Sequence, residues 1–453
     1  MRARALVGWA ALAAATACDE GFRVDPNFCA TRPGNPSCPA AGAAGAAGSG
    51  GGAGLGGASG DGGAGGTAGL GGGGAGGGLV CSAPAVDCGG KCIDVTASDA
   101  ANCGACGYAC GAGSTCADGA CSPVPVVGGV VAPYAFALDA DNLYFVVPVR
   151  DTANALPPAV QRVPRAGGAP VSVFGTVASV RSRSLVLADG TLYFGDLDNN
   201  GVIRKGPLDG SSVAVHLANQ PAVQQLAAAD GRLWWSAFTG TSFVRSASAT
   251  GTPAAADELA FQTGRADALA VEGAGASATL FWVNRDASPV DTKSGLWRKA
   301  GAAAAERLVE VPGLRALGLG PDGAYVTDGS TVSRASKDAP GALAEVVGAA
   351  ATGGAVQGLA VADGKLYWLA VTAQGQLEVH RSALDGTGAR VLGRVAAKQP
   401  AYWAQPLGPA QLAVDGGFVY FSDVGSVTGD TQAAPNLQGV SGAADGAIYR
   451  LPD

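Results

Sequence analysis

A repeated unit of three short strand-like segments runs through most of this chain. Its clearest copy begins at Leu359 as Leu-Ala-Val-Ala-Asp-Gly-Lys-Leu-Tyr-Trp and closes as His-Arg-Ser-Ala-Leu-Asp-Gly at residues 380–386. The pattern predicts an apolar strand, a Gly turn, a strand ending in aromatic residues, and a third strand leading to a second turn. It occurs seven times between Pro133 and Asp453. A period of about 40–50 residues built from short strands predicts an all-β fold, a seven-bladed β-propeller, with six or eight blades as alternatives.

Large and small residues alternate in the first strand of each copy. These strands are expected at residues 136–138, 185–187, 226–228, 269–271, 317–319, 359–361 and 412–414. Successive side chains of a strand point to opposite faces, so each first strand presents bulk to one neighbouring blade and a small residue to the other. A small residue allows the close approach that blades need near the propeller axis.

The second strands end in bulky pairs, which we expect in the core between blades. The pairs are Tyr144-Phe145, Tyr193-Phe194, Trp234-Trp235, Phe281-Trp282, Tyr325-Val326, Tyr367-Trp368 and Tyr420-Phe421. Each third strand carries an arginine at the same place. These are Arg162, Arg204, Arg245, Arg298, Arg334, Arg381 and Arg450. We expect each arginine to brace its own blade against a carbonyl or acid; a ring of ligand-binding arginines is the alternative.

The two ends of the repeat region are expected to meet. The last copy stops at Asp453, directly after its third strand, and lacks an outer strand. Residues 124–131, just before the first copy, are apolar and of strand length. We predict that they supply the missing strand, since closing the ring removes exposed sheet edges.

The copy at residues 185–211 contains Tyr-Phe-Gly-Asp at 193–196, Val-Ile-Arg at 202–204 and Leu-Asp-Gly-Ser at 208–211. This run resembles the YWTD repeats of low-density-lipoprotein-receptor propellers. Tyr-Val-Thr-Asp at 325–328 and Tyr-Phe-Ser-Asp at 420–423 are similar to the same tetrapeptide. The resemblance implies an extracellular propeller, in a family that usually has six blades.

The first residues have the features of an export signal. Residues 1–4 are basic, and residues 5–15 form an apolar stretch too short to span a bilayer. The following Ala-Thr-Ala-Cys resembles the signal of bacterial lipoproteins, which implies a lipid anchor on Cys18. Of the 11 cysteines, an even set remains when Cys18 is set aside, and this suits disulfide pairing. Secretion after cleavage behind Ala17 is the alternative.

Gly and Ala dominate residues 40–80, and such a segment buries too little apolar surface to offset its chain entropy. A disordered tether is therefore expected there. The predicted organisation is a signal peptide at 1–17, a lipid-anchored segment at 18–39, the tether at 40–80, a cysteine-rich module at 81–122 and the propeller at 123–453.

Disulfides are expected because cysteines of an exported chain meet an oxidising compartment. The expected disulfide cysteines are Cys29, Cys38, Cys81, Cys88, Cys92, Cys103, Cys106, Cys110, Cys116 and Cys121. The last eight lie among few large apolar residues, so cross-links must replace a core, and their pairing is open. The segments Cys88-Gly-Gly-Lys-Cys92, Asn102-Cys-Gly-Ala-Cys106 and Asp118-Gly-Ala-Cys121 resemble the cysteine-rich repeat of plant stigma-specific proteins, which implies a disulfide module without an activity of its own. The alternative is zinc, bound by Cys103, Cys106, Cys110 and Cys116.

Residues two positions before each first strand are expected at the mouth of the central tunnel. They are Tyr134, Arg183, Gln224, Asp267, Arg315, Gln357 and Ala410. Because the set is polar and mixed in charge, we predict a ligand-binding surface, whereas a metal cage would need several acids or histidines. Ordinary polarity of loops in water is the alternative.

A calcium site is the alternative to a simple turn at residues 196–201. Asp196, Asp198 and Asn200 match the first half of a calcium loop, but Pro207 stands where the loop needs Glu. We therefore expect a turn there, no catalytic residue and no cofactor, with calcium left open. His216 and His380, the two histidines, fall in different copies and do not suggest a catalytic pair.

The net charge of −7, without a basic tract, argues against a nucleic-acid partner. The sequence predicts a monomeric lipoprotein of the bacterial cell envelope that meets the membrane through its lipid alone. Its propeller is expected to bind or scaffold an envelope protein or glycan. The alternatives are an envelope enzyme of the lactonase or lyase type, with its site at the tunnel, and a purely structural envelope element.

Overall fold

The computed structural model describes most of the chain from Leu79 onward. The described residues are 79–148, 150–151, 159–174, 184–196, 201–220, 223–238, 242–261, 265–273, 277–285, 294–398, 412–428 and 441–453. They belong to one compact unit, Leu70–Asp453. Several predictions fall outside them: the signal peptide, Cys18, Cys29, Cys38, the tether up to residue 78, Arg183, Asp198, Asn200 and Ala410. Among the described residues, no helix combines the length and apolar character needed to cross a membrane.

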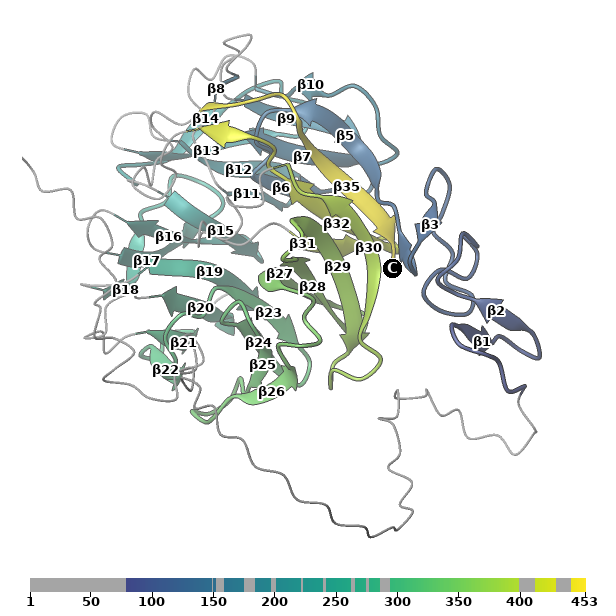
Figure 1. The fold of residues 1–453 in the computed structure, drawn as a ribbon. Coiled ribbons are helices and arrows are strands. Elements are labelled where there is room, and N and C mark those ends of the chain that lie inside the picture. Colours follow the sequence, from purple (N-terminus) through teal and green to yellow (C-terminus); the bar gives the residue numbers. More distant parts are fainter. Residues whose placement is uncertain are drawn as a thin grey trace, which may run out of the picture. The chain divides into compact units, whose positions relative to one another are not determined.

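Antiparallel sheets arranged as the blades of a propeller make up the described part of residues 124–453 (Figure 1). Blade 1 consists of β6 (Ala135–Leu138), β7 (Asn142–Val147), β9 (Ala159–Pro164) and β10 (Val171–Ser172). Blade 2 consists of β11 (Leu185–Ala188), β12 (Thr191–Asp196), β13 (Val202–Pro207) and β14 (Ala214–Ala218). Blade 3 consists of β15 (Val223–Ala229), β16 (Arg232–Phe238), β17 (Ser242–Ser248) and β18 (Ala256–Phe261).

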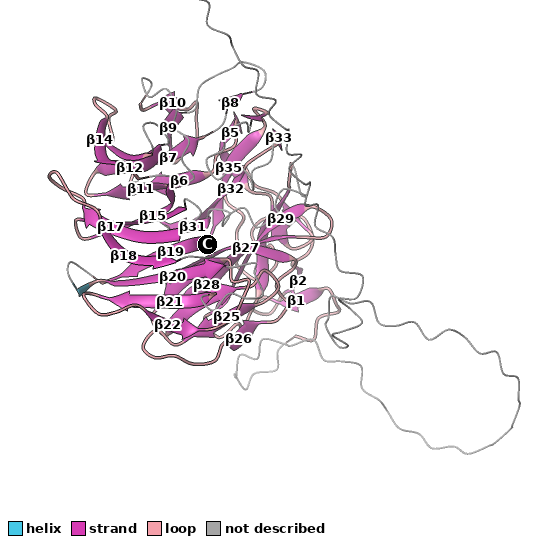
Figure 2. Ribbon diagram, turned by 90° about the vertical axis from the view of Figure 1, so that its left-hand side faces the viewer, coloured by secondary structure: helices cyan, strands magenta, loops and turns pink. Residues whose placement is uncertain are grey.

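Four further blades complete the ring within the described residues. Blade 4 consists of β19 (Arg265–Glu272), β20 (Thr279–Arg285), β21 (Gly295–Ala300) and β22 (Glu306–Val309). Blade 5 consists of β23 (Ala316–Gly320), β24 (Gly323–Thr327), β25 (Val332–Ala335) and β26 (Ala344–Val347). Blade 6 begins with β27 (Ala355–Ala362), β28 (Lys365–Val371), β29 (Gln376–Ala383) and β30 (Arg390–Ala396). Blade 7 consists of β31 (Leu412–Asp415), β32 (Phe418–Asp423), β35 (Gly446–Pro452) and β5 (Val124–Val130), and Figure 2 shows blades 1 to 5 stacked in succession.

The count of seven blades confirms the predicted fold and excludes the six-bladed and eight-bladed alternatives. Short turns between first and second strands explain part of this regularity. Asp189-Gly190, Asp230-Gly231 and Asp363-Gly364 each form a two-residue loop in which both residues have positive φ. Such loops match the twist of the flanking strands, and Asp-Gly is a favoured pair for them.

The bulky pairs of the second strands fill the seams between blades, as predicted. The first member of a pair packs toward the following blade and the second member toward the preceding one: Tyr193 joins the cluster of blades 2 and 3, and Phe194 that of blades 1 and 2. Both members are nearly inaccessible to water. The alternation follows from the two-residue period of a strand. Gly318 in β23 meets the expectation for small residues near the axis, because a Cβ there would lie 3.3 Å from Val361 of blade 6.

The predicted closure of the ring is confirmed. β5 pairs antiparallel with β35 as the outer strand of blade 7, with Val127 opposite Ile448 and Val130 opposite Gly446. Val127 is 2% exposed and belongs to the core cluster that joins blades 6, 7 and 1. A small additional sheet of β33 (Val427–Thr428), β34 (Ser441–Gly442) and β8 (Arg150–Asp151) connects blades 7 and 1 at one end.

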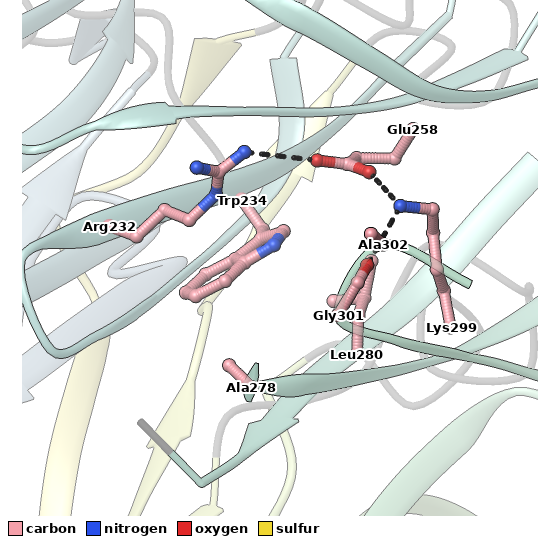
Figure 3. Close-up of a pocket in the computed structure, with 8 residues that line it drawn as sticks. All are labelled: Arg232, Trp234, Glu258, Ala278, Leu280, Lys299, Gly301 and Ala302. Atoms are coloured by element: carbon pink, nitrogen blue, oxygen red, sulfur yellow. Dashed lines mark hydrogen bonds and ion pairs between the residues drawn. The ribbon is translucent and has the colours of Figure 1, made fainter. Parts of the chain in front are cut away.

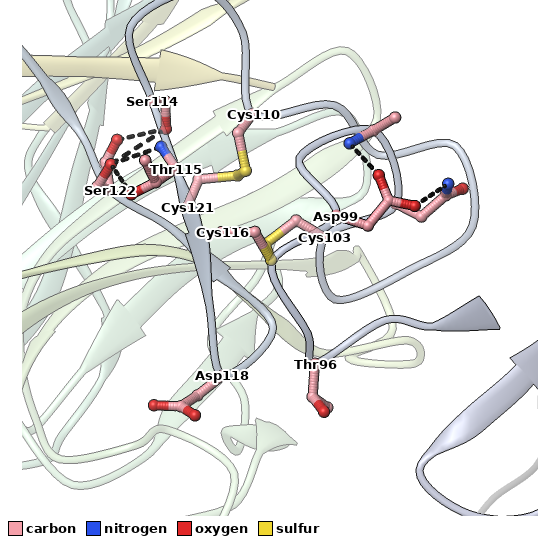
Figure 4. Close-up of a disulfide and its surroundings, with 12 residues drawn as sticks. Thr96, Asp99, Cys103, Cys110, Ser114, Thr115, Cys116, Asp118, Cys121 and Ser122 are labelled. Carbon is pink, nitrogen blue, oxygen red and sulfur yellow. Dashed lines mark hydrogen bonds between the residues drawn. A yellow bond between two sulfur atoms is a disulfide. The ribbon is translucent and has the colours of Figure 1, made fainter.

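The cysteine-rich module is cross-linked by disulfides, as predicted. Within residues 79–148 there are four: Cys81–Cys92, Cys88–Cys106, Cys103–Cys116 and Cys110–Cys121. Figure 4 shows the last two, which tie Cys103 and Cys110 to Cys116 and Cys121 on two neighbouring strands. The Sγ atoms of Cys103, Cys110 and Cys121 lie close together, but all three are in disulfides. A disulfide sulfur is not the thiolate that binds zinc, so the pairing does not support the zinc alternative.

The module extends the sheet of blade 6. Its hairpin of β3 (Cys116–Ala117) and β4 (Ala120–Cys121) follows β30, and Cys121 pairs in parallel with Gly393. A Cβ at position 393 would lie 2.7 Å from the Cys121 carbonyl oxygen, so the contact requires glycine. A second hairpin, β1 (Ala85–Asp87) and β2 (Cys92–Asp94), forms a sheet of its own.

The arginines repeated in the third strands act as braces, but the prediction that each braces its own blade holds only in part. Three donate across a seam to the turn after the next third strand: Arg162 to the Leu208 carbonyl at 3.1 Å, Arg298 to that of Lys337 at 2.6 Å and Arg450 to that of Arg165 at 2.7 Å. Three pair with acids of their own blades, Arg204 with Asp196, Arg245 with Asp257 and Arg334 with Asp322. Arg381 of blade 6 pairs with Asp453 at the end of blade 7.

Candidate functional site

Three of the residues predicted at the tunnel mouth occupy one repeated structural position. Gln224, Asp267 and Gln357 each lie where the register between first and second strand shifts by one residue. Such bulges free a residue from the ladder and re-aim its side chain. The side chains of Gln224 and Gln357 are buried, at 5% and 4% exposure. The Gln357 amide donates to the Ala355 carbonyl, two residues earlier, at 3.3 Å. Sequence alignment thus identified equivalent positions, although two of these side chains are enclosed by the protein.

Two other predicted mouth residues are half-buried. Tyr134 precedes β6, and Arg315 precedes β23. The guanidinium of Arg315 lies against Gly329, since a Cβ there would be 3.0 Å from the guanidinium carbon. Arg315 therefore remains near the surface at the end of the blades where the first strands begin.

The candidate calcium ligand Asp196 is a buried acid with a protein partner. Its carboxylate accepts a hydrogen bond from Arg204 at 2.6 Å, and its side chain is fully buried. The two other candidate ligands lie outside the described residues. Asp196 therefore serves the bracing of blade 2.

The two histidines lie in different blades, as predicted, and each packs in a seam. In blade 2, His216 donates from Nε2 to the Ser248 carbonyl of blade 3 at 2.9 Å. Burial lowers its pKa below the usual 6.5. In blade 6, His380 stacks on Trp368 with ring centres 5.0 Å apart, and its Nε2 lies 3.1 Å from the Glu378 carboxylate. They form no catalytic pair with each other.

A cavity of about 300 Å³ opens in the seam between blades 3 and 4. It is lined by Arg232, Trp234, Glu258, Ala278, Leu280, Lys299, Gly301 and Ala302, which we call the seam pocket (Figure 3). The pocket lies where the first strands end and the second strands begin, opposite the predicted tunnel mouth. Trp234, Ala278 and Leu280 are buried and form its apolar floor.

Charged groups converge on the rim of the seam pocket. The Glu258 carboxylate accepts hydrogen bonds from Arg232 at 3.2 Å and from Lys299 at 2.5 Å, and a third from the Ser246 hydroxyl. The Glu258 and Lys299 side chains are 11% and 16% exposed, while that of Arg232 is 39% exposed. Burial alone would raise the pKa of Glu258, but the hydrogen bonds from Lys299, Ser246 and Arg232 outweigh it and lower that pKa. Glu258 is therefore ionised at neutral pH.

The seam pocket lies where the repeat departs from a tyrosine contact that recurs at other seams. At four other seams, the residue directly after a third strand contacts a tyrosine of the preceding blade: Tyr193 donates to the Ala249 carbonyl, Tyr325 to that of Leu384 and Tyr367 to the Asp453 carboxylate, while Tyr420 accepts from Arg165. Trp234 takes the tyrosine's place in blade 3, and Gly301 is the equivalent turn residue of blade 4. The Gly301 carbonyl accepts instead from Lys299 of its own blade at 3.1 Å.

Sequence reasoning missed the seam pocket. A usable signal was present, since Trp234 opens its pair where five other copies have tyrosine. The two cations and the acid gave no such signal, because they lie on three different strands, β16, β18 and β21.

Comparison with known proteins yields resemblance of fold alone. No protein-family model matches the chain, and no curated protein matches it. Among solved structures, the WD40 β-propeller domain of Doa1 is 12% identical, with a TM-score of 0.49, over 73% of this chain and 97% of that one. YCF48 bound to a D1 peptide is 11% identical, with a TM-score of 0.46, over 73% and 96%. The designed protein Ika8 is 14% identical, with a TM-score of 0.45, over 73% and 98%.

Proposed function

We propose that this chain is a lipid-anchored binding protein of the bacterial cell envelope whose propeller holds a protein or glycan partner. The disulfides of the described module indicate an oxidising, extracytoplasmic compartment. Cys18 would carry the anchor, and residues 40–80 would act as a tether.

The observation that carries the binding function is the seam pocket. A concave apolar site with a few convergent polar groups is the usual form of a ligand site. The hydrogen bond from Lys299 to Glu258 crosses the seam between blades 3 and 4 and holds these two pocket groups in place. The partner would contact the pocket through Arg232, its most exposed charged side chain.

Capture of a partner from the native envelope by the mature, purified chain tests this function. Arg232→Gln and Ala278→Leu alter the seam pocket, Arg315→Ala alters the predicted tunnel mouth, and Arg334→Gln is the control. Arg334 matches Arg232 in exposure, 39%, and lies in blade 5 with Asp322 as its partner. A partner retained by the control but lost by both pocket variants supports the proposal; equal retention by all variants contradicts it.

The anchor is tested separately. Wild-type protein should partition with membranes after export and take up labelled fatty acid, whereas Cys18→Ala should do neither. Release of both proteins into the medium would favour ordinary secretion and refute the lipid anchor.

A further inference from the structure

Among the described residues, the cations of the seam pocket outnumber the acids that pair with them. Arg232 and Lys299 share one acid, Glu258, which leaves the trio with a net charge of +1. Arg232 contacts Ser246 and Glu258 through Nη2, and Lys299 donates to Glu258 and the Gly301 carbonyl. A guanidinium has five N–H groups and an ammonium three, so both cations retain donors for an added acceptor.

The charge arrangement favours a monoanion over a dianion. Figure 3 shows the Glu258 carboxylate between the two cations, each of which donates a hydrogen bond to it. A phosphate dianion at this rim would face the Glu258 carboxylate and be repelled by it. A single carboxylate can accept from Arg232 in a charge-assisted pair and add only one negative charge beside Glu258.

The floor of the pocket selects an apolar group of limited size. Trp234 and Leu280 are 4% and 2% exposed, and Ala278 is 6% exposed. A volume of about 300 Å³ is at the lower end for ligand sites, enough for one residue-sized group. At the seam between blades 5 and 6, the Tyr325 hydroxyl reaches the carbonyl of Leu384, the turn residue that corresponds to Gly301. The pocket therefore matches a compact aromatic or aliphatic group attached to a carboxylate.

We infer that the seam pocket binds a monocarboxylate attached to a compact apolar group, such as the last residue of a peptide with a free carboxyl end. The carboxylate pairs with Arg232 and Lys299, and the apolar group rests on Trp234 and Leu280. This inference rests on the binding function proposed above and specifies the ligand chemistry of the same pocket.

Calorimetric titration of the purified chain tests the inference with two kinds of probe. Peptide probes are Ala-Ala-Phe with a free carboxylate and the same peptide as its amide; phenylacetate represents a free acid. We expect the acid peptide to bind about tenfold or more tightly than the amide, because a charge-assisted hydrogen bond is lost. Phenylacetate distinguishes the sources: binding as strong as that of the peptide assigns the site to free acids, and much weaker binding assigns it to peptide ends.

Substitutions in the seam pocket test whether the probes bind there. Arg232→Gln should weaken the acid peptide by about tenfold or more and leave the amide nearly unchanged. Ala278→Leu should abolish both by filling the floor, and Arg334→Gln should change neither. If Ala278→Leu does not fold, the affinities of the acid and amide peptides, compared in the wild type and in Arg232→Gln, still test the inference.

Two results overturn the inference. These are equal binding of acid and amide, and undiminished binding of the acid by Arg232→Gln. Loss of envelope capture by the pocket variants together with no binding of any probe would refute the carboxylate ligand while leaving the proposed function intact. Probe binding without any envelope capture would refute the proposed partner and keep the ligand.

Discussion

Arg450 of blade 7 donates a hydrogen bond of 2.7 Å to the backbone carbonyl of Arg165 in blade 1, across 285 residues of sequence. The same guanidinium lies over the Phe418 ring at 5.0 Å. The last repeat is thus joined to the first by an arginine-to-carbonyl hydrogen bond of the kind that Arg162 forms between blades 1 and 2.

Arg450→Met should lower the free energy of unfolding by about 1–3 kcal/mol, because it retains an apolar stem but leaves the Arg165 carbonyl without its donor. Arg334→Met removes a more exposed arginine that pairs with Asp322 and should cost about 0–1 kcal/mol. Denaturant titration measures both. Equal effects of the two substitutions would show that the cross-seam bond adds nothing to ring closure.

Val127→Asp should destabilise the protein strongly. Val127 is 2% exposed in the outer strand of blade 7, and the substitution buries a charge in the core cluster of the closing seam. We expect the Tm to fall by roughly 5 °C or more. Val215→Asp is the matched control, since Val215 is 48% exposed in an outer strand of blade 2. A small shift for Val127→Asp, similar to that of the control, would argue against closure by β5.

Gly393→Ala should loosen the cysteine-rich module from blade 6, because the added Cβ would lie 2.7 Å from the Cys121 carbonyl oxygen. Hydrogen exchange at Cys121 and in β30 should rise, while exchange in blades 2 to 4 stays unchanged. Gly341→Ala provides the control, since a Cβ there meets nothing within 4 Å. Unchanged protection in β30 would mean that the module does not need this close approach.

His216 should make the protein less stable under mildly acidic conditions. Burial lowers its pKa in the folded state, although the hydrogen bond to the Ser248 carbonyl acts in the opposite direction. The folded state therefore takes up a proton less readily than the unfolded chain. The stability contribution is complete above the usual pKa of 6.5 and is lost as the pH falls through the lowered folded pKa.

His216→Gln keeps a donor for the Ser248 carbonyl but cannot titrate. We expect the Tm of the wild type to fall more steeply than that of His216→Gln as the pH is lowered from 7 to 5. Above pH 7, the Tm values of the two proteins should change with pH in parallel. Parallel plots of Tm against pH over the whole range would show that His216 does not cause the loss of stability at acidic pH.

Much of the fold could be predicted because its determinants are local and repeated. Asp-Gly turns, aromatic second strands and the arginine of each third strand recur at matching positions, and each needs only its own blade to form a strand or turn. Closure was also predictable, since the missing last strand and the unassigned strand at residues 124–131 are both visible in the sequence. The burial of Gln224 and Gln357 was not, because it depends on bulges in the pairing of first and second strands.

The sequence by itself determined an all-β repeat, its buried aromatic pairs and its closing strand, because hydrophobic period and turn chemistry act over a few residues. The structure settled the blade number at seven, which the sequence had left between six and eight. The tertiary structure alone decided the disulfide pairing, the attachment of the module to blade 6 through Gly393, and the seam pocket. In the pocket, Arg232, Glu258 and Lys299 come together from two blades. Such contacts depend on how neighbouring sheets pack, and no spacing along the chain encodes them directly.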